Sequence, residues 1–150
     1  MTVSYLQAID DMVLMFKQTW DAGTTAIVGL VPEVRYQGAK KESALPVNVY
    51  WARWSQQTVI QRQDGFSNGA PNTRRFLSLG LLTVQLFAPQ DANQSMDKLR
   101  KLAMLARDAY KAKRSPNGIT FTNVRVNELD PDGKEFRANV VSDYQFHSVG

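Results

Sequence analysis

The sequence predicts an α+β domain, a mostly antiparallel sheet with two helices packed on one of its faces. Two stretches carry apolar residues at the three- and four-residue spacing of a helix, and two pairs of stretches are rich in the β-branched and aromatic residues typical of strands. The order along the chain is helix, strand, strand, helix, strand, strand. Because each element has one apolar side, packing both helices on one face of one sheet buries all of them. A length of 150 residues fits a single domain over residues 1–150.

The first helix is expected from Tyr5 to Trp20, and Gly23 is suited to end it. The following stretch, 24–46, has no periodic pattern, and only residues 34–36 look extended. We therefore expect an irregular connection that contains one short strand. The apolar stripe of the helix consists of Leu6, Ile9, Val13, Phe16 and Trp20.

Two long strands are expected next. The first is predicted over residues 47–54, and its polar continuation to residue 61 also fits a strand. The second begins at Arg75 or Phe76 and runs to Phe87, where a following proline closes it.

The connection between these strands, Asp64 to Arg74, has the composition of a loop. Glycine, serine, asparagine and proline dominate it, and Phe66 is its only large apolar residue. So little apolar surface does not offset the cost of ordering the backbone, about 1 to 2 kcal/mol per residue. We predict that this loop is mobile in the isolated subunit and ordered only against a neighbouring subunit, with Arg74 and Arg75 available for charged pairing.

The second helix is predicted over residues 91–114, where Asp91 and Gln94 have the spacing of a capping box. A serine, proline, asparagine and glycine at 115–118 end it. Its buried stripe consists of Met96, Leu99, Leu102, Ala103, Ala106 and Tyr110.

A hairpin is predicted at the end of the chain, with strands over 119–129 and 134–147 joined by the turn 130–133. The second strand alternates between an apolar and a polar face. The apolar face carries Phe136, Ala138, Val140, Ser142, Tyr144 and Phe146. The opposite face carries Arg137, Asn139, Val141, Asp143 and Gln145.

Residue types that carry catalysis are scarce. The chain has no cysteine, and its one histidine, His147, stands three residues from the C-terminus. Histidine and cysteine are the groups most often used near neutral pH for catalysis and for binding zinc. Asp10 and Asp11 are neighbours, about 100° apart on a helix, and are expected on its solvated face. The segment 130–133 is similar to the start of a calcium loop but lacks its later ligands, so a plain turn is expected. We expect no enzymatic activity, no cofactor and no metal site, and a small enzyme that relies on two carboxylates is the alternative.

The charge balance is mildly basic, because Lys and Arg exceed Asp and Glu by 18 to 14, a net charge of +4. Basic residues concentrate in the second helix, where they either solvate its outer face or form the phosphate-contacting surface of a nucleic-acid-binding module. No stretch is apolar over the roughly 18 residues that a membrane span needs, and the N-terminus has no signal-peptide pattern. We expect a protein made in the cytoplasm, with no membrane partner. The basic residues are Lys98, Arg100, Lys101, Arg107, Lys111, Lys113 and Arg114.

Two tryptophans mark the faces of the first long strand. Trp51 and Trp54 are three residues apart and therefore point to opposite faces of the sheet. One is expected in the core, and the other on the partner-facing side, where aromatic residues are favoured in subunit interfaces. The candidate interface residues are Trp51 and Arg53 on the sheet face, and Phe66, Arg74 and Arg75 on the loop.

Several of these segments resemble the tail terminator family of long-tailed bacteriophages, over about residues 34–146. In one departure, members of the family often carry glycines just after the strand-ending proline, where this chain has Gln90-Asp91-Ala92-Asn93-Gln94. The similar segments are Val34-Arg35-Tyr36, then Tyr50-Trp51-Ala52-Arg53-Trp54, the polar loop to Arg74-Arg75, Gly80-Leu81-Leu82-Thr83-Val84-Gln85-Leu86-Phe87-Ala88-Pro89 before an amphipathic helix, and a final hairpin with Tyr144 near its end.

The resemblance implies a virion structural protein of the tail or neck that caps the tail tube as a homo-hexameric ring. Such a ring stops tube polymerisation, binds the tube protein on one side and head-completion or connector proteins on the other, and lets DNA pass through its lumen without sequence-specific contact. Cyclic symmetry needs two different patches on each subunit, which a sheet edge and a protruding hairpin loop could provide. Another phage neck or minor tail component of similar fold, and a basic nucleic-acid-binding module, are the alternatives.

Overall fold

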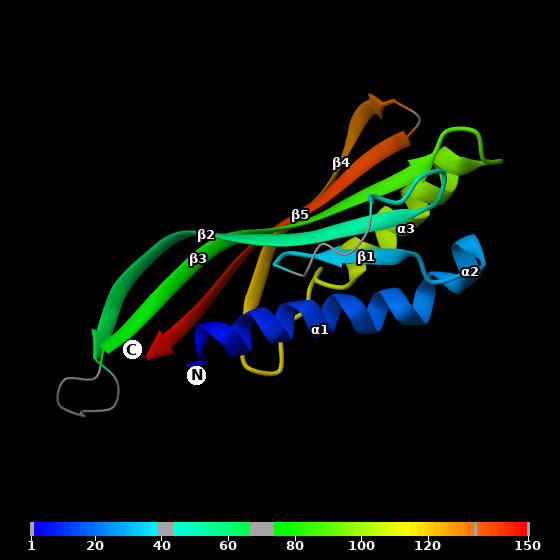
Figure 1. The fold of residues 1–150 in the computed structure, drawn as a ribbon. Coiled ribbons are helices and arrows are strands. Elements are labelled where there is room, and N and C mark those ends of the chain that lie inside the picture. The colour runs from blue at the N-terminus through cyan, green and yellow to red at the C-terminus, as the bar shows by residue number, and fades with distance from the viewer. Residues whose placement is uncertain (1, 39–43, 67–73, 134, 150) are drawn as a thin grey trace.

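One five-stranded sheet runs along the molecule, and helices cover one of its faces (Figure 1). The structure is a computed structural model and describes residues 2–38, 44–66, 74–133 and 135–149. The predicted α+β class is confirmed. The elements are α1 (Tyr5–Gly23), α2 (Thr25–Val28), β1 (Glu33–Tyr36), β2 (Trp51–Phe66), β3 (Arg74–Pro89), α3 (Ser95–Asp108), β4 (Thr120–Asp132) and β5 (Glu135–Val149).

The strand order in the sheet is β1-β2-β3-β5-β4. All neighbouring pairs are antiparallel except β1 and β2, which are parallel from Glu33 beside Trp51 to Tyr36 beside Trp54. β2 and β3 form a hairpin that projects beyond the helices at one end of the molecule (Figure 1). β4 and β5 form the second hairpin, whose turn lies at the other end.

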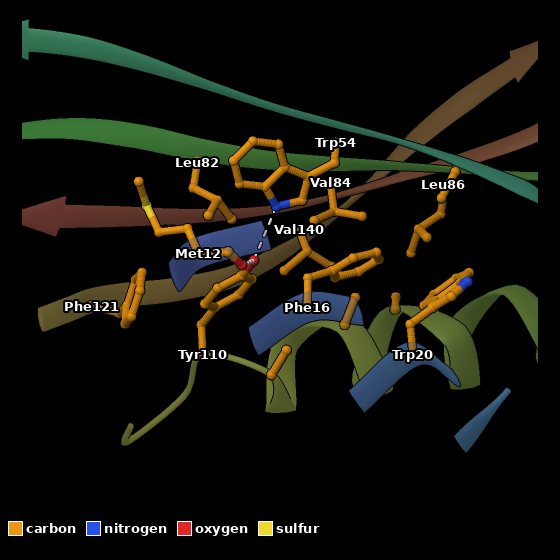
Figure 2. Close-up of a cluster of buried hydrophobic side chains, with 14 of the residues drawn as sticks. Met12, Phe16, Trp20, Trp54, Leu82, Val84, Leu86, Tyr110, Phe121 and Val140 are labelled. Atoms are coloured by element: carbon orange, nitrogen blue, oxygen red, sulfur yellow. Dashed lines mark hydrogen bonds between the residues drawn. The ribbon is translucent and has the colours of Figure 1, made fainter. Parts of the chain in front are cut away.

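The core lies between the sheet and the two long helices, α1 and α3. α1 starts with a capping box, in which the Ser4 hydroxyl accepts a hydrogen bond from the Gln7 amide at 3.2 Å. No helix of the described residues is long and apolar enough to cross a membrane. The inward-facing side chains include Met12, Phe16 and Trp20 from α1, Leu99 and Leu102 from α3, and Trp54, Leu82, Val84, Leu86 and Val140 from the sheet (Figure 2).

The boundaries of β2 differ from the prediction at both ends. The strand begins at Trp51 because Asn48, with φ at 59°, interrupts the extended conformation expected from residue 47. It continues to Phe66, which pairs with Arg74, while Gly65 pairs with Arg75. The prediction of a loop is therefore wrong at both of its ends, because pairing with β3 supplies backbone hydrogen bonds that outweigh the turn preference of the sequence. The rest of the predicted loop, 67–73, lies outside the described residues, so its mobility stays a prediction.

The second helix is shorter than predicted. Gln94 has φ at 55° and makes no side-chain capping bond, so the capping box expected from Asp91 does not form. The hydroxyl of Ser95 instead donates to the Pro89 carbonyl. At the far end, Ala112 has φ at 57°, which no α-helical residue adopts, and the chain turns before residue 114.

Two hydrogen bonds through Tyr110 tie the sheet to α1 and to the turn that follows α3 (Figure 2). The Trp54 indole N–H donates to the Tyr110 hydroxyl at 3.0 Å, and that hydroxyl donates to the Met12 carbonyl at 2.7 Å. Both polar side-chain groups are fully buried, so each requires its partner. These two hydrogen bonds therefore fix the positions of α1 and of the turn after α3 against β2.

The burial of Tyr110 predicts loss of stability at alkaline pH. Burial raises the pKa of Tyr110 well above the ordinary tyrosine value of 10.0, so the folded state keeps a proton that the unfolded chain releases near that pH. Stability is thus fully present below pH 10 and falls above it, by about 1.4 kcal/mol per pH unit for one such group. Urea unfolding between pH 8 and pH 12 should show this slope, and Tyr110→Phe should reduce it. An equal slope in both proteins would contradict the prediction.

Candidate subunit interface

The sheet face opposite the helices is left uncovered by the described helices (Figure 1). Alternate residues of each long strand point toward it, and across its middle they form a polar row. The side chains of this row are half-buried or exposed, whereas the residues between them that point toward the helices are mostly buried. The middle of this face is thus polar enough to stay in contact with water. The row consists of Arg53, Gln85, Asn139 and Asn127.

Trp51 lies on this uncovered side, on the opposite face from Trp54, as predicted. Its ring stacks on Phe87, with centroids 4.1 Å apart and planes 10° apart, and its indole N–H donates to Glu135 at 2.8 Å. The Arg53 guanidinium lies 5.4 Å from the Trp51 ring centroid and 5.9 Å from that of Phe87. Trp51 is only 2% exposed, whereas the Arg53 side chain is half-buried, so Arg53 is the more accessible of the two predicted interface residues here.

A groove of about 340 Å³ opens farther along, where the β2–β3 hairpin leaves the helices. Val59 and Ile60 of β2 flank it and are 58% and 48% exposed. Leu79 and Leu81 of β3 line its floor, and Thr122, Asp143 and Gln145 line the side toward β4. Exposed aliphatic groups beside a hollow are characteristic of a protein contact surface.

The five predicted interface residues fall into two groups at opposite ends of β2. Trp51 and Arg53 lie together at its start, as described above. Phe66, Arg74 and Arg75 lie at the tip of the β2–β3 hairpin, where Phe66 pairs with Arg74 and both arginines are exposed. The sequence analysis did not predict Val59 and Ile60 as contact residues. Two aliphatic β-branched residues within an otherwise polar stretch of a strand could have indicated them.

Asp11 and His147 were considered as candidates for catalysis or metal binding, and the structure places both at half-buried positions. Asp11 was expected on a solvated face, and this expectation is wrong. Its two carboxylate oxygens accept from the backbone and side-chain N–H groups of Asn117 at 3.1 and 3.0 Å, which holds the 115–118 turn against α1. His147 lies within β5, half-buried and opposite Leu77. Within the described residues, no group of three or more His, Asp or Glu residues is placed to hold a metal ion.

Basic residues of α3 are engaged with acids. Arg100 contacts Glu128 of β4, and this contact raises the pKa of Arg100 and lowers that of Glu128. Lys101 lies 3.2 Å from Asp97. These pairs are exposed and contribute little to stability, but they neutralise much of the helix surface. Lys111, Lys113 and Arg114 lie exposed beyond the helix, in the turn that precedes β4.

Comparisons with known proteins concern the fold. No family model and no curated protein matches the sequence. One solved structure that carries no functional name superposes with a TM-score of 0.58 at 13% identity, covering 91% of this chain and 94% of that one. A chain in the structure of the virion of a native gene transfer agent (GTA) particle superposes with a TM-score of 0.54 at 10% identity, covering 91% of this chain and 92% of that one. The chain therefore has, over nine-tenths of its length, the fold of a component of a virion.

Proposed function

We propose that this protein is a virion structural protein that assembles as a ring on the end of a phage tail tube. The observation that carries the proposal is the fold shared with a chain of the gene transfer agent virion over nine-tenths of both chains. The sequence segments that resemble tail terminators point to the same class. In this role the protein ends tube polymerisation and provides the surface to which the head is joined.

The shape of the subunit supports a ring. Ring closure by cyclic symmetry needs two different contact patches on one subunit. The structure offers an uncovered sheet face with a groove, and a hairpin that projects beyond the helices (Figure 1). The proposed partners are further copies of the chain in a homo-hexamer, the tail tube protein, and a head-completion or connector protein. DNA passes through the lumen without sequence-specific contact, and no catalysis is required.

Removal of the protein during particle assembly tests the role. A terminator stops tube growth, so its loss should give headless tails of irregular, increased length, and adding the purified protein to the tubes should stop further growth. Mass measurement on isolated wild-type tails should find one ring of copies per tail. Tails of normal length in its absence would contradict the terminator role.

The same experiment separates a second candidate, another neck or minor tail component, which the virion fold match favours equally. Loss of such a component should leave tail length normal while heads fail to join, or while tails lose infectivity. A nucleic-acid-binding module would rely on the exposed Lys111, Lys113 and Arg114, and would show binding to duplex DNA that weakens steeply with salt.

A further inference from the structure

A polar hollow lies at the edge of the sheet, where β4 begins. Its volume is about 230 Å³, and the turn 115–118 forms one of its walls. Arg114 and Thr120 face each other across this turn in an antiparallel bridge, so their side chains lie on the same face of the sheet. Thr120 also pairs with Gln145 of β5, which places all three side chains in one row. His147 follows two residues later on β5 and lines the same hollow.

The wall of the hollow is held in place by hydrogen bonds within the protein. The Ser115 hydroxyl accepts from the Ile119 amide at 2.9 Å, and the Ser115 carbonyl accepts from the Gly118 amide at 3.0 Å. The backbone and side-chain N–H groups of Asn117 donate to Asp11, which fixes the turn against α1. Little further ordering of this wall is therefore needed when a ligand enters the hollow.

The side chains around the hollow are donors suited to an anion. Arg114 contributes a guanidinium, Thr120 a hydroxyl and Gln145 an amide group. Among the described residues, no carboxylate lines the hollow and none pairs with the guanidinium of Arg114. The groove beside Val59 differs in this respect, because Asp143 is one of its lining residues. Since the planar fork of an arginine matches two oxygens of a phosphate, the hollow favours a phosphate group.

Further cations flank the hollow on two sides. Lys111 and Lys113 are exposed in the turn that leads to Arg114. On the other side, Arg62 of β2 is exposed and lies in the same row of the sheet as His147. Two strand spacings, about 10 Å, separate these two residues. Cations spread over such a width suit a chain of phosphates better than a single ion, because several phosphates can then each meet a positive charge.

The acids nearest to the hollow are engaged by other groups. Asp11 accepts from Asn117, and Asp143 lies 3.7 Å from Arg125. Among the described side chains around the hollow, the cations outnumber these acids. The electrostatic potential at the hollow is therefore positive, which attracts a polyanion.

We propose that Arg114, Thr120 and Gln145 bind one phosphate group of a DNA backbone, and that the flanking cations meet its neighbouring phosphates. This inference rests on the proposed function, which supplies the DNA that passes through the ring. It goes beyond that function by naming where the subunit touches the DNA. Contacts to phosphates carry no sequence information, so the site accepts DNA of any sequence.

Binding of the full chain to a short DNA duplex of arbitrary sequence tests the site, with the affinity measured over a range of salt concentrations. Wild type should bind, and more weakly as salt rises. Arg114→Gln, at an exposed position, should lower the affinity and reduce the salt slope by about 1, the contribution of one phosphate contact. Lys101→Gln is the matched control, since it removes the same charge from the exposed surface of α3 and should leave the slope unchanged. Absence of binding by wild type, or an equal loss in both variants, would overturn the proposal.

Thr120→Val separates a phosphate seated in the hollow from a general attraction to positive charge. The substitution keeps the β-branched shape and the net charge but removes the hydroxyl that lines the hollow. The affinity for DNA should therefore fall several-fold while the salt slope stays unchanged. An undiminished affinity in Thr120→Val would overturn the placement of a phosphate at this position.

Inorganic phosphate, titrated at constant ionic strength, separates the two sources of the same group. It should compete only weakly with the duplex, because it offers one phosphate and not a chain of them. Binding of inorganic phosphate without binding of the duplex would overturn DNA as the ligand.

Tail length separates this inference from the proposed function. Particles assembled with Arg114→Gln should have tails of normal length, because the substitution leaves the ring contacts in place. Irregular tails in this variant would assign Arg114 to a subunit contact and overturn its role in the hollow. Unchanged DNA binding by Arg114→Gln would contradict the inference alone, whereas normal tails in the absence of the whole protein would contradict the proposed function.

Discussion

Replacing Trp54 by alanine is expected to lower the free energy of unfolding by about 3 to 5 kcal/mol, the range for truncating a large buried aromatic side chain. Trp54 is 1% exposed and lies at the centre of the core, between the sheet and the two long helices (Figure 2). The substitution removes this packing and also leaves the Tyr110 hydroxyl without its buried donor. Loss of stability should therefore exceed that of any change at an exposed apolar residue.

Chemical denaturation of a series of variants would measure this effect. Trp54→Phe keeps most of the apolar volume and loses the indole N–H, so it should fall between wild type and Trp54→Ala. Tyr110→Phe removes the hydroxyl that connects Trp54 to Met12 and should cost about 1 to 3 kcal/mol. Val47→Ala, at a 70% exposed position, is the control and should change stability by less than about 0.5 kcal/mol. Equal stability of Trp54→Ala and Val47→Ala would show that the core is not organised around this residue.

A methyl group at Gly80 is expected to destabilise the protein by about 1 to 3 kcal/mol, the usual cost of overpacking a close-packed site. Gly80 lies in β3 directly opposite Tyr144 of β5. The Tyr144 side chain crosses over it to reach β2, where its hydroxyl lies 3.1 Å from the Thr58 hydroxyl and donates to Gln56 at 2.6 Å. A Cβ at position 80 would collide with the Tyr144 ring and with the Gln57 carbonyl. The ring can move, but the backbone carbonyl of a paired strand cannot move without disturbing the sheet.

Thermal unfolding of Gly80→Ala should therefore show a clear decrease in Tm. Ser78→Ala is a suitable control, because Ser78 is the neighbouring inward-facing residue of β3, is fully buried and already has a Cβ. Its hydroxyl has no hydrogen-bond partner within the described part of the chain, so its removal should be neutral or slightly stabilising. A Gly80→Ala protein as stable as Ser78→Ala would mean that Tyr144 and β2 adjust freely around position 80.

Elements with a strong local pattern were predicted from the sequence with good accuracy. The stripe from Leu6 to Trp20 predicted α1, and Phe16 and Trp20 are buried as expected, but Leu6 is 74% exposed and Ala8 and Met12 complete the buried side instead. The alternation from Phe136 to Phe146 predicted both faces of β5. These predictions succeeded because helix and strand periodicities arise from backbone geometry and burial of one side, which neighbouring residues report directly. The opposite orientations of Trp51 and Trp54 follow from the same rule.

Features that depend on partners distant in sequence were decided by the tertiary structure. Gly65 and Phe66 have a loop-like context but lie in β2 because β3 pairs with them, and Asp11 is hydrogen-bonded because the turn at Asn117 packs beside α1. The burial of Trp51 depends on Phe87 and Glu135, which stand in two other strands.

The sequence by itself determined the class of fold, the order of the long helices and strands and the core-facing side of the long strands. It did not predict the short helix α2, and it placed the exposed Leu6 on the inward side of α1. Only the tertiary structure decided which strands are neighbours, and so which edges stay open. The parallel strand β1 ends beside Trp54, and this leaves the rest of β2 uncovered in the described structure. Local periodicity carries no information about that stopping point, because it is set by backbone hydrogen bonds between segments and not by the side-chain pattern of either segment.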